Sequence, residues 1–193
     1  MLAVEERPCI GVISMESGVG KTLFTHSLGA VLAGTGKDVI LIDLNFMGGG
    51  QYNRLGCANQ SGATDYLAEE IDISLSPGIP EQNQQLIQRI LRPTRFPGLK
   101  IIPRGVQKSG QEDLYKSENM KHLVLGAKSV SEAVIVDLSS VAAAGNDIYT
   151  AVNSCSIAAI ICKRGMSSAS GVSRIYRAVS GLSVHSFVFI NQV

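Results

Sequence analysis

The stretch SMESGVGKTLF, residues 14–24, joins an apolar segment to the start of a helical pattern. The preceding run CIGVIS, residues 9–14, is almost continuously apolar, which is typical of a strand buried on both faces. Gly18 and Gly20 permit a tight turn, and a helix is expected to begin at Lys21. At such a strand–turn–helix junction the backbone N–H groups converge, and the helix dipole adds its positive end. The stretch therefore predicts a loop that binds phosphate.

The side chains of this loop suggest separate roles. Lys21 can reach the β and γ phosphates of a nucleotide, and the Thr22 hydroxyl can ligate Mg²⁺. We expect the nucleotide to contact the rest of the loop and the first helical turn as well, at Ser17, Gly18, Val19, Gly20 and Leu23. The usual form G-x-x-x-x-G-K-[ST] is not met, because Met15 occupies the position of its first glycine. The loop is therefore a deviant one, although its strand–turn–helix context argues against a chance GKT turn.

A second departure in the loop is an acidic residue, Glu16. The loop resembles those of the partitioning and cell-division-site ATPases, in which a lysine at this position reaches across a dimer to the partner's nucleotide. A glutamate excludes that form of activation because its charge has the wrong sign, and a carboxylate beside the phosphates would repel them. Glu16 is therefore expected either to point away from the nucleotide or to leave the site weak.

Two aspartates follow apolar runs elsewhere in the chain. Asp43 ends the run VILID at residues 39–43, and Asp137 ends AVIVD at residues 133–137. Because α/β sheets bind ligands at their strand ends, Asp43 is a candidate for the Mg²⁺ water shell or for a base. Asp137 is a candidate for orienting Mg²⁺ through water, and a simple turn cap is the alternative for Asp43. The candidate catalytic residues are Lys21, Asp43 and Asp137, and the candidate metal ligands are Thr22, Asp43 and Asp137.

Apolar runs and helical patterns alternate along the chain. The predicted strands are residues 9–14, 38–43, 99–103, 133–138, 157–162 and 184–190. The predicted helices are residues 21–35, 64–70, 81–92, 111–127, 145–153 and 167–181. This alternation predicts an α/β fold of three layers, in which helices flank a mostly parallel central sheet, as in P-loop NTPases. The irregular segment 48–97 shows no linker and no change in composition, so residues 1–193 are expected to form a single nucleotide-binding domain.

The composition narrows the choice of partners and location. The chain has 193 residues, 45% of them hydrophobic, and a net charge of +1, which provides no general attraction to nucleic acid. The basic residues between 89 and 108, Arg104 among them, lack interleaved aromatics and are interpreted as a solvated face rather than a docking surface. No apolar run approaches the roughly 20 residues of a membrane span, and the acidic start is too short for a signal peptide. We expect a cytoplasmic protein with no nucleic-acid partner.

Cysteines and histidines provide no sign of a metal site. Cys9, Cys57, Cys155 and Cys162 lack metal-like spacing and are expected to be small, mostly buried hydrophobes in a reducing compartment. The three histidines are isolated and are expected to be structural.

Four segments together resemble the cytoplasmic ATP-binding domain of bacterial tyrosine kinases, the regulators of capsule and exopolysaccharide chain length. Residues 18–46, GVGKTLFTHSLGAVLAGTGKDVILIDLNF, are similar to that family's phosphate loop, following helix and second aspartate motif. The similarity continues in RLGCANQSGATDYLAEEIDI (54–73) and GLKIIPRGVQKSGQEDLYKSENMKHLV (98–124). AVIVDLSSV (133–141) falls where the family has its Walker B aspartate followed by threonine and two prolines.

The resemblance implies a fold, cofactors and a partner. The fold would be that of the MinD/ParA-like class of P-loop proteins with a deviant Walker A loop, and the cofactors would be ATP or ADP with Mg²⁺. The partner would be a membrane polysaccharide chain-length or co-polymerase protein, which would hold the chain at the cytoplasmic face of the inner membrane. Homo-oligomers are a further option.

Several departures from the family pattern bear on activity. Asn45 stands where the family has a second aspartate, and an amide cannot act as a base. Phe46 and Met47 replace the arginine and proline that commonly follow, and Ser139 and Ser140 come after the Walker B aspartate. These changes indicate a degenerate member of the family.

The family's phosphorylation site and its oligomerisation motif are also not evident in this sequence. The family carries a C-terminal tyrosine cluster, whereas the last tyrosine here, Tyr176, lies in a predicted helix, so autophosphorylation on such a cluster is not expected. An arginine–glutamate helix motif that closes rings is not recognisable, and Glu5, Glu6 and Arg7 are interpreted as a solvated start.

The last candidate residue is Asn191, which follows the final predicted strand. Related ATPases use an asparagine in this place to bind the base, and a plain strand cap is the alternative. The leading hypothesis is a nucleotide-binding regulatory partner in polysaccharide synthesis or export with weak or no kinase activity. The alternatives are an active ATPase or protein kinase, a MinD/ParA-like positioning ATPase, and a scaffold whose loop stays empty.

Overall fold

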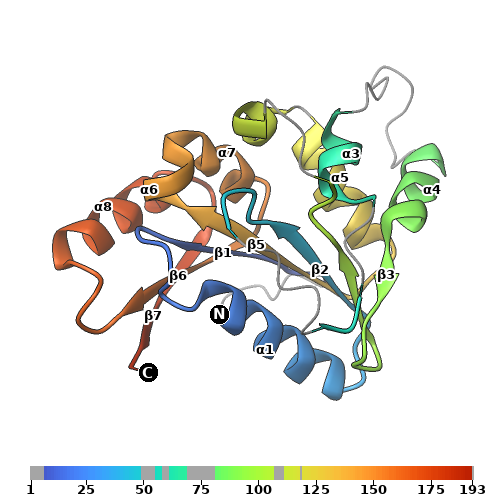
Figure 1. Ribbon diagram of the computed structural model, residues 1–193, viewed down its shortest axis with the longest axis horizontal. Coiled ribbons are helices and arrows are strands. Elements are labelled where there is room, and N and C mark those ends of the chain that lie inside the picture. The colour runs from blue at the N-terminus through green and yellow to red at the C-terminus, as the bar shows by residue number, and fades with distance from the viewer. Residues whose placement is uncertain are drawn as a thin grey trace.

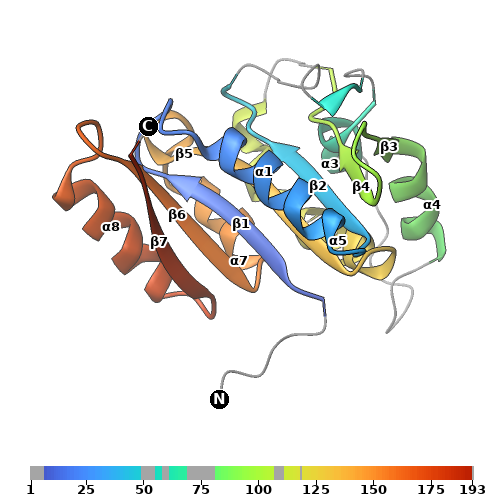
Figure 2. The same cartoon turned by 90° about the horizontal axis from the view of Figure 1, so that it is seen from below.

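A seven-stranded sheet organises the part of the chain that the computed structural model describes, residues 7–48, 55–57, 61–68, 81–106, 111–117 and 119–192. Its strands are β1 Cys9–Ser14, β2 Val39–Leu44, β3 Arg92–Pro93, β4 Leu99–Ile102, β5 Ala133–Ser140, β6 Ile157–Lys163 and β7 His185–Asn191. They lie in the order β3-β4-β2-β5-β1-β6-β7, as Figure 1 and Figure 2 show. All neighbouring strands pair in parallel except β3 with β4.

Helices cover both faces of this sheet. They are α1 Lys21–Gly34, α3 Ala63–Ala68, α4 Glu81–Ile90, η2 Gln111–Lys116, α5 Asn119–Ser129, α6 Val141–Ala144, η3 Gly145–Asp147, α7 Ile148–Asn153 and α8 Ala169–Ser180. Helix α1 lies along one face, and α3, α5, α7 and α8 lie over the other (Figure 1). Alternate residues of the central strands pack on the two sides: Ile135 faces the α1 side, whereas Val134 and Val136 face the other. This two-sided burial explains the continuous apolar runs and confirms the predicted three-layer α/β fold.

The structure departs from the sequence prediction in several elements. The antiparallel strand β3 was not predicted, since two residues leave no periodic signal. The helix predicted at 111–127 is split into the 3₁₀ segment η2 and α5. The helix predicted at 145–153 is replaced by α6, η3 and α7, which together begin at Val141. Gly145 adopts a φ of 70° and ends α6, so the helical region is interrupted there. Residues 5 and 6, expected to be solvated, lie outside the described residues.

Strand β7 is an apolar run that is not buried on both faces. Phe187, Val188, Phe189 and Ile190 are between 42% and 65% exposed. Within the described residues β7 pairs only with β6 and is an edge of the sheet. An apolar run therefore identified the strand correctly, but it could not distinguish a central position from an edge.

The glycine of the motif SGATD is required by a close backbone approach. Ala63 N–H donates to the Pro103 carbonyl oxygen at 2.8 Å, and the Asp65 carboxylate accepts the Gly62 N–H at 2.8 Å at the start of α3. A Cβ atom on Gly62 would lie 2.0 Å from the Pro103 oxygen. The contact holds α3 against the chain that follows β4.

We predict that Gly62→Ala lowers the free energy of unfolding by roughly 1–3 kcal/mol, because the backbone must move to admit the methyl group. Gly34→Ala is the matched control, since no atom lies within 4 Å of its added Cβ. That change should be neutral or should stabilise α1 by up to about 1 kcal/mol. Urea denaturation of both variants measures the difference, and equal stabilities would contradict the prediction.

In the part of the chain that the structure describes, no helix is both long enough and apolar enough to cross a bilayer.

Candidate nucleotide-binding site

The predicted phosphate loop connects β1 to α1 at the carboxyl edge of the sheet. Gly18 and Gly20 have φ angles of 80° and 99°, a region that side chains with a Cβ avoid, so the turn depends on both glycines. Helix α1 starts without a side-chain cap and without an acidic residue in its first turn. Its N-terminal N–H groups and dipole therefore face the loop in the manner that binds anions.

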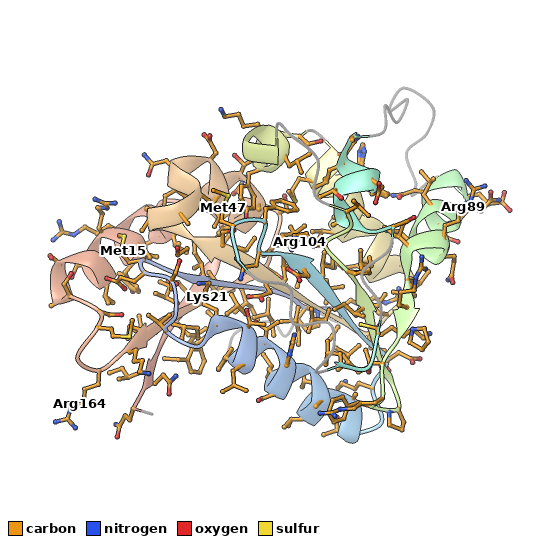
Figure 3. All side chains as sticks on the ribbon, viewed as in Figure 1. Met15, Lys21, Met47, Arg89, Arg104 and Arg164 are labelled. Carbon is orange, nitrogen blue, oxygen red and sulfur yellow. The ribbon has the colours of Figure 1, made fainter. Side chains whose placement is uncertain are left out.

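Lys21 lies inside this loop rather than in solvent (Figure 3). The residue is 5% exposed, and its Nζ donates to Ser14 Oγ at 2.9 Å. Burial lowers the pKa of Lys21, and the negative charges of Asp137 and Glu16 oppose that shift. The amine is thus held at the mouth of α1, where a phosphate would supply the anionic partner.

The two candidate carboxylates are neighbours across the sheet. Asp43 and Asp137 are register partners in β2 and β5, and they are 7% and 1% exposed. Thr22 Oγ1 donates to Asp137 Oδ2 at 2.6 Å, and Thr25 Oγ1 lies 3.5 Å from Asp137 Oδ1. All three residues predicted as metal ligands are therefore brought together, from segments far apart in the sequence.

Electrostatics favours a cation at this point. Burial and the neighbouring Asp43 raise the pKa of Asp137 to about 7, while the Thr22 hydroxyl and Lys21 act in the opposite direction. A divalent cation beside the pair would compensate the repulsion between the two carboxylates.

The donor set fits Mg²⁺ bound together with phosphates. The pair supplies carboxylate oxygens and Thr22 a hydroxyl, which are the hard ligands that Mg²⁺ prefers. Among the described residues, no group of three or more histidine, cysteine or acidic side chains could hold a metal ion alone. Mg²⁺ beside nucleotides is commonly bound by one or two carboxylates together with the substrate phosphates.

A cavity of about 340 Å³ lies beside the loop. It is lined by Gly20, Leu23, Phe24, Ser27, Ile161, Phe189, Ile190 and Asn191. The rings of Phe24 and Phe189 are 5.0 Å apart between centroids, so the walls are largely apolar and suit a planar base. Asn191 Nδ2 donates to the Val19 carbonyl oxygen at 3.0 Å, which places its amide beside this cavity. Val19 as a whole is fully buried, and its carbonyl oxygen is already bound by Asn191.

Glu16 is oriented by the loop after β6. Its Oε2 accepts the hydroxyl proton of Ser167 at 2.9 Å, and its carbonyl oxygen accepts the Ser14 hydroxyl at 2.6 Å. On the opposite side of the loop, the Ser17 and Ser140 hydroxyls are 2.8 Å apart. The phosphate loop is thus tied to the ends of both β5 and β6.

Three side chains that build the site were not predicted from the sequence. Tyr115 and Ser139 contact each other through their hydroxyls at 2.8 Å behind the carboxylates. Arg104 was assigned to a solvated face, yet it is 8% exposed and donates to the carbonyl oxygens of Asn45 and Phe46 at 3.1 and 3.4 Å, and to that of Gly48. Its position directly after the buried strand β4 was the one available signal. Lys108, at the end of the same basic run, lies outside the described residues.

The fold and the loop define a class of nucleotide-binding proteins, and comparison with known families agrees. Residues 10–152 match the CobQ/CobB/MinD/ParA nucleotide binding domain, and the chain belongs to this family. Within it, the chain is 28% identical over 141 residues to the tyrosine-protein kinase ptk of Acinetobacter johnsonii. That match covers 70% of this chain and 17% of the relative, so the chain spans less than a fifth of the kinase's length.

Solved structures have the same fold. The kinase domain of the Escherichia coli tyrosine kinase ETK superposes with a TM-score of 0.81 at 21% identity, over 97% of this chain and 68% of that one. The septum site-determining protein MinD of Pyrococcus horikoshii, solved as a complex with Mg-ADP, superposes with a TM-score of 0.62 at 15% identity, over 93% of this chain and 68% of that one. The chain is therefore similar to both bacterial tyrosine kinases and MinD, as the sequence resemblance predicted.

Proposed function

We propose that this chain binds ATP or ADP with Mg²⁺ and acts as a nucleotide-dependent regulatory partner in bacterial polysaccharide synthesis or export. The observation that carries the proposal is the convergence of Lys21, Thr22 and the Asp43–Asp137 pair at the uncapped start of α1. A cation, a hydroxyl and two carboxylates around a helix N-terminus are the groups that hold a polyphosphate and its metal.

In the proposed complex each group has one task. The loop N–H groups and Lys21 bind the β and γ phosphates, and Thr22 contributes a ligand to Mg²⁺. Asp43 and Asp137 orient the metal directly or through water. The apolar cavity beside Phe24 receives the base, with the Asn191 amide at its edge. Bound Mg²⁺ would neutralise charge that develops on the phosphates.

Two residues of the site favour the proposal that phosphoryl transfer is slow or absent. Asn45 cannot accept a proton as a base, and its Oδ1 already accepts the Ser139 hydroxyl at 3.3 Å. The position of a trans-activating lysine carries Glu16, whose carboxylate is bound by Ser167. These groups are therefore arranged to bind a nucleotide more than to cleave it.

The proposed location is the cytoplasm, at the inner membrane through a partner. The similarity to tyrosine-protein kinases supports a membrane chain-length or co-polymerase protein as that partner. The proposal treats residues 1–193 as a single nucleotide-binding domain. Homo-oligomers are compatible with it, and nucleic acid is not proposed as a ligand.

A second candidate function is an active ATPase or protein kinase. It is favoured by the retention of Lys21, Thr22, Asp43 and Asp137 in one connected cluster. If it holds, Asp43 is the group placed to act as a base, since it adjoins Asp137 at the strand ends.

Binding and turnover separate the two functions. A fluorescent ATP analogue is titrated with and without Mg²⁺, and phosphate release and phosphotyrosine are measured on the same sample. We expect Mg²⁺-dependent binding without measurable phosphate release or phosphotyrosine. Steady turnover would support the second candidate, and absence of binding at millimolar nucleotide would overturn the proposal. Co-sedimentation with membranes that carry a chain-length protein, with and without nucleotide, tests the partner.

Glu16 provides a prediction about affinity. Glu16→Gln keeps an oxygen for the Ser167 hydroxyl but removes the charge near the phosphates. We expect ATP to bind roughly 5-fold more tightly at low salt, which is about 1 kcal/mol of relieved repulsion, and the gain to shrink as salt is added. Ser167→Ala is the control, because it releases the carboxylate without neutralising it and should not tighten binding. Isothermal titration calorimetry measures both, and unchanged affinity in Glu16→Gln would contradict the prediction.

A further inference from the structure

A buried pair of hydroxyls joins the carboxyl ends of β2 and β5. Tyr115, from η2, is 2% exposed, and Ser139, near the end of β5, is fully buried. The Tyr115 hydroxyl can donate to the Leu44 carbonyl oxygen or to Ser139 Oγ at 2.8 Å, and it accepts the Ser139 N–H at 3.2 Å. One phenol therefore bonds to both strands at once.

The pair lies directly behind the candidate metal ligands. Leu44 follows Asp43 in the chain, and Ser139 is two residues after Asp137. The two aspartates are register partners, and their like charges repel at close range. A hydrogen-bonded bridge immediately beyond them resists separation of the two strand ends in the absence of a cation.

The same hydroxyls also hold the chain that leaves β2. Ser139 Oγ accepts the Met47 N–H at 3.3 Å and donates to Asn45 Oδ1 at 3.3 Å. The Phe46 ring packs against the Tyr115 ring, with centroids 5.1 Å apart. The network therefore adds side-chain bonds just beyond the backbone ladder of β2 and β5, which ends at Leu44 and Leu138, and it holds the path of the residues after Asp43.

These bonds depend on the residue types present here. Ser139 uses both its N–H and its hydroxyl in them, and Asn45 uses its amide oxygen. Proline has neither an N–H nor a hydroxyl, so it could make none of the contacts that Ser139 makes with Tyr115 and Met47. Burial raises the pKa of Tyr115, which keeps the phenol protonated and able to donate. Tyr115, Ser139 and Asn45 thus form one connected hydrogen-bond network.

We infer that Tyr115 and Ser139 are positioning residues that fix Asp43 and Asp137 for Mg²⁺, and that Asn45 serves this network as a hydrogen-bond acceptor. The inference rests on the proposed Mg²⁺-dependent nucleotide binding. Neither hydroxyl is expected to touch the nucleotide, since both residues are buried and act through the strand ends.

The test compares Tyr115→Phe and Ser139→Ala with wild-type protein by two measurements. In nucleotide-free protein, amide hydrogen exchange at Met47 and at residue 139 is expected to accelerate at least about 10-fold in Tyr115→Phe and Ser139→Ala. The Mg²⁺ concentration for half-maximal binding of a fluorescent ADP analogue is expected to rise roughly 10-fold, as outer-shell substitutions at metal sites do. Nucleotide affinity without Mg²⁺ should stay within about 2-fold of wild type, because the phosphate loop is unaltered.

Tyr66→Phe is the matched control. Tyr66 is also 2% exposed and donates to Asn83 Oδ1 at 2.6 Å, away from the candidate site. It should lower the melting temperature as much as Tyr115→Phe without changing the Mg²⁺ requirement or the exchange near Met47. Unaltered exchange, an unaltered Mg²⁺ requirement in Tyr115→Phe, or an equal effect of Tyr66→Phe would overturn the inference. If wild-type protein bound no nucleotide, the proposed function would be wrong. Amide hydrogen exchange would still decide whether Tyr115 and Ser139 hold the ends of β2 and β5 together.

Discussion

Replacing Lys21 by alanine is expected to weaken binding of Mg·ATP by roughly 100-fold, because charge-assisted hydrogen bonds to two phosphates are lost together. The amine is 5% exposed and is held at the loop by Ser14, so it is already placed for the ligand. Alanine leaves the loop N–H groups and the start of α1 intact, and some phosphate affinity should remain. Titration of a fluorescent ATP analogue measures the loss.

The fold should survive this change. Lys21 opposes the burial that raises the pKa of Asp137, so its removal lets that carboxyl group keep its proton more readily at neutral pH. We therefore expect little change in melting temperature without nucleotide. Lys37→Ala, an exposed lysine beyond the opposite end of α1, is the control and should bind as wild type does. A Lys21→Ala protein with wild-type affinity would show that the phosphates bind elsewhere.

The second large effect is expected for Asp137→Asn, which should stabilise the nucleotide-free protein at pH 8 by up to about 4 kcal/mol. The pKa of Asp137 is raised from 3.8 to about 7 by burial and by Asp43, with Thr22, Thr25 and Lys21 as its other neighbours. Between these two pH values the folded protein binds more protons than the unfolded chain. Wild-type stability should therefore fall as pH rises from about 4 to about 7, and asparagine removes that loss.

Urea denaturation in chelator-containing buffer from pH 4 to pH 8 tests the slope. The two proteins should converge near pH 4, where the wild-type carboxyl group is protonated in the folded state. With Mg²⁺ and ATP the stability difference at pH 8 should shrink by about 1.4–2.7 kcal/mol, since the variant loses an orienting group for the metal and about 10–100-fold in Mg²⁺-dependent affinity. Parallel stability curves for the two proteins would contradict the assigned pKa. Retained Mg²⁺ dependence would contradict the assigned metal role.

Local patterns in the sequence were enough to predict the central strands, the loop and the charged residues of the site. Strands β1, β2 and β5 were predicted to within two residues, because burial on both faces makes them continuously apolar. Gly18, Gly20 and Lys21 identified the loop, since positive φ angles and a helix start have strong local preferences. Asp43 and Asp137 were each predicted as metal ligands from their places at strand ends, and the structure makes them register partners.

The contacts that hold these residues in place could not be predicted from the sequence. Tyr115 and Ser139 are 24 positions apart, and Glu16 and Ser167 are 151 positions apart. Arg104 is buried with its charge against backbone carbonyl oxygens. Strand β7 was recognised, but its exposure was not, because an apolar run is the same at an edge and in the centre. Composition and periodicity report preferences of neighbouring residues. Contacts between distant segments depend on how all the elements pack, which no local pattern encodes.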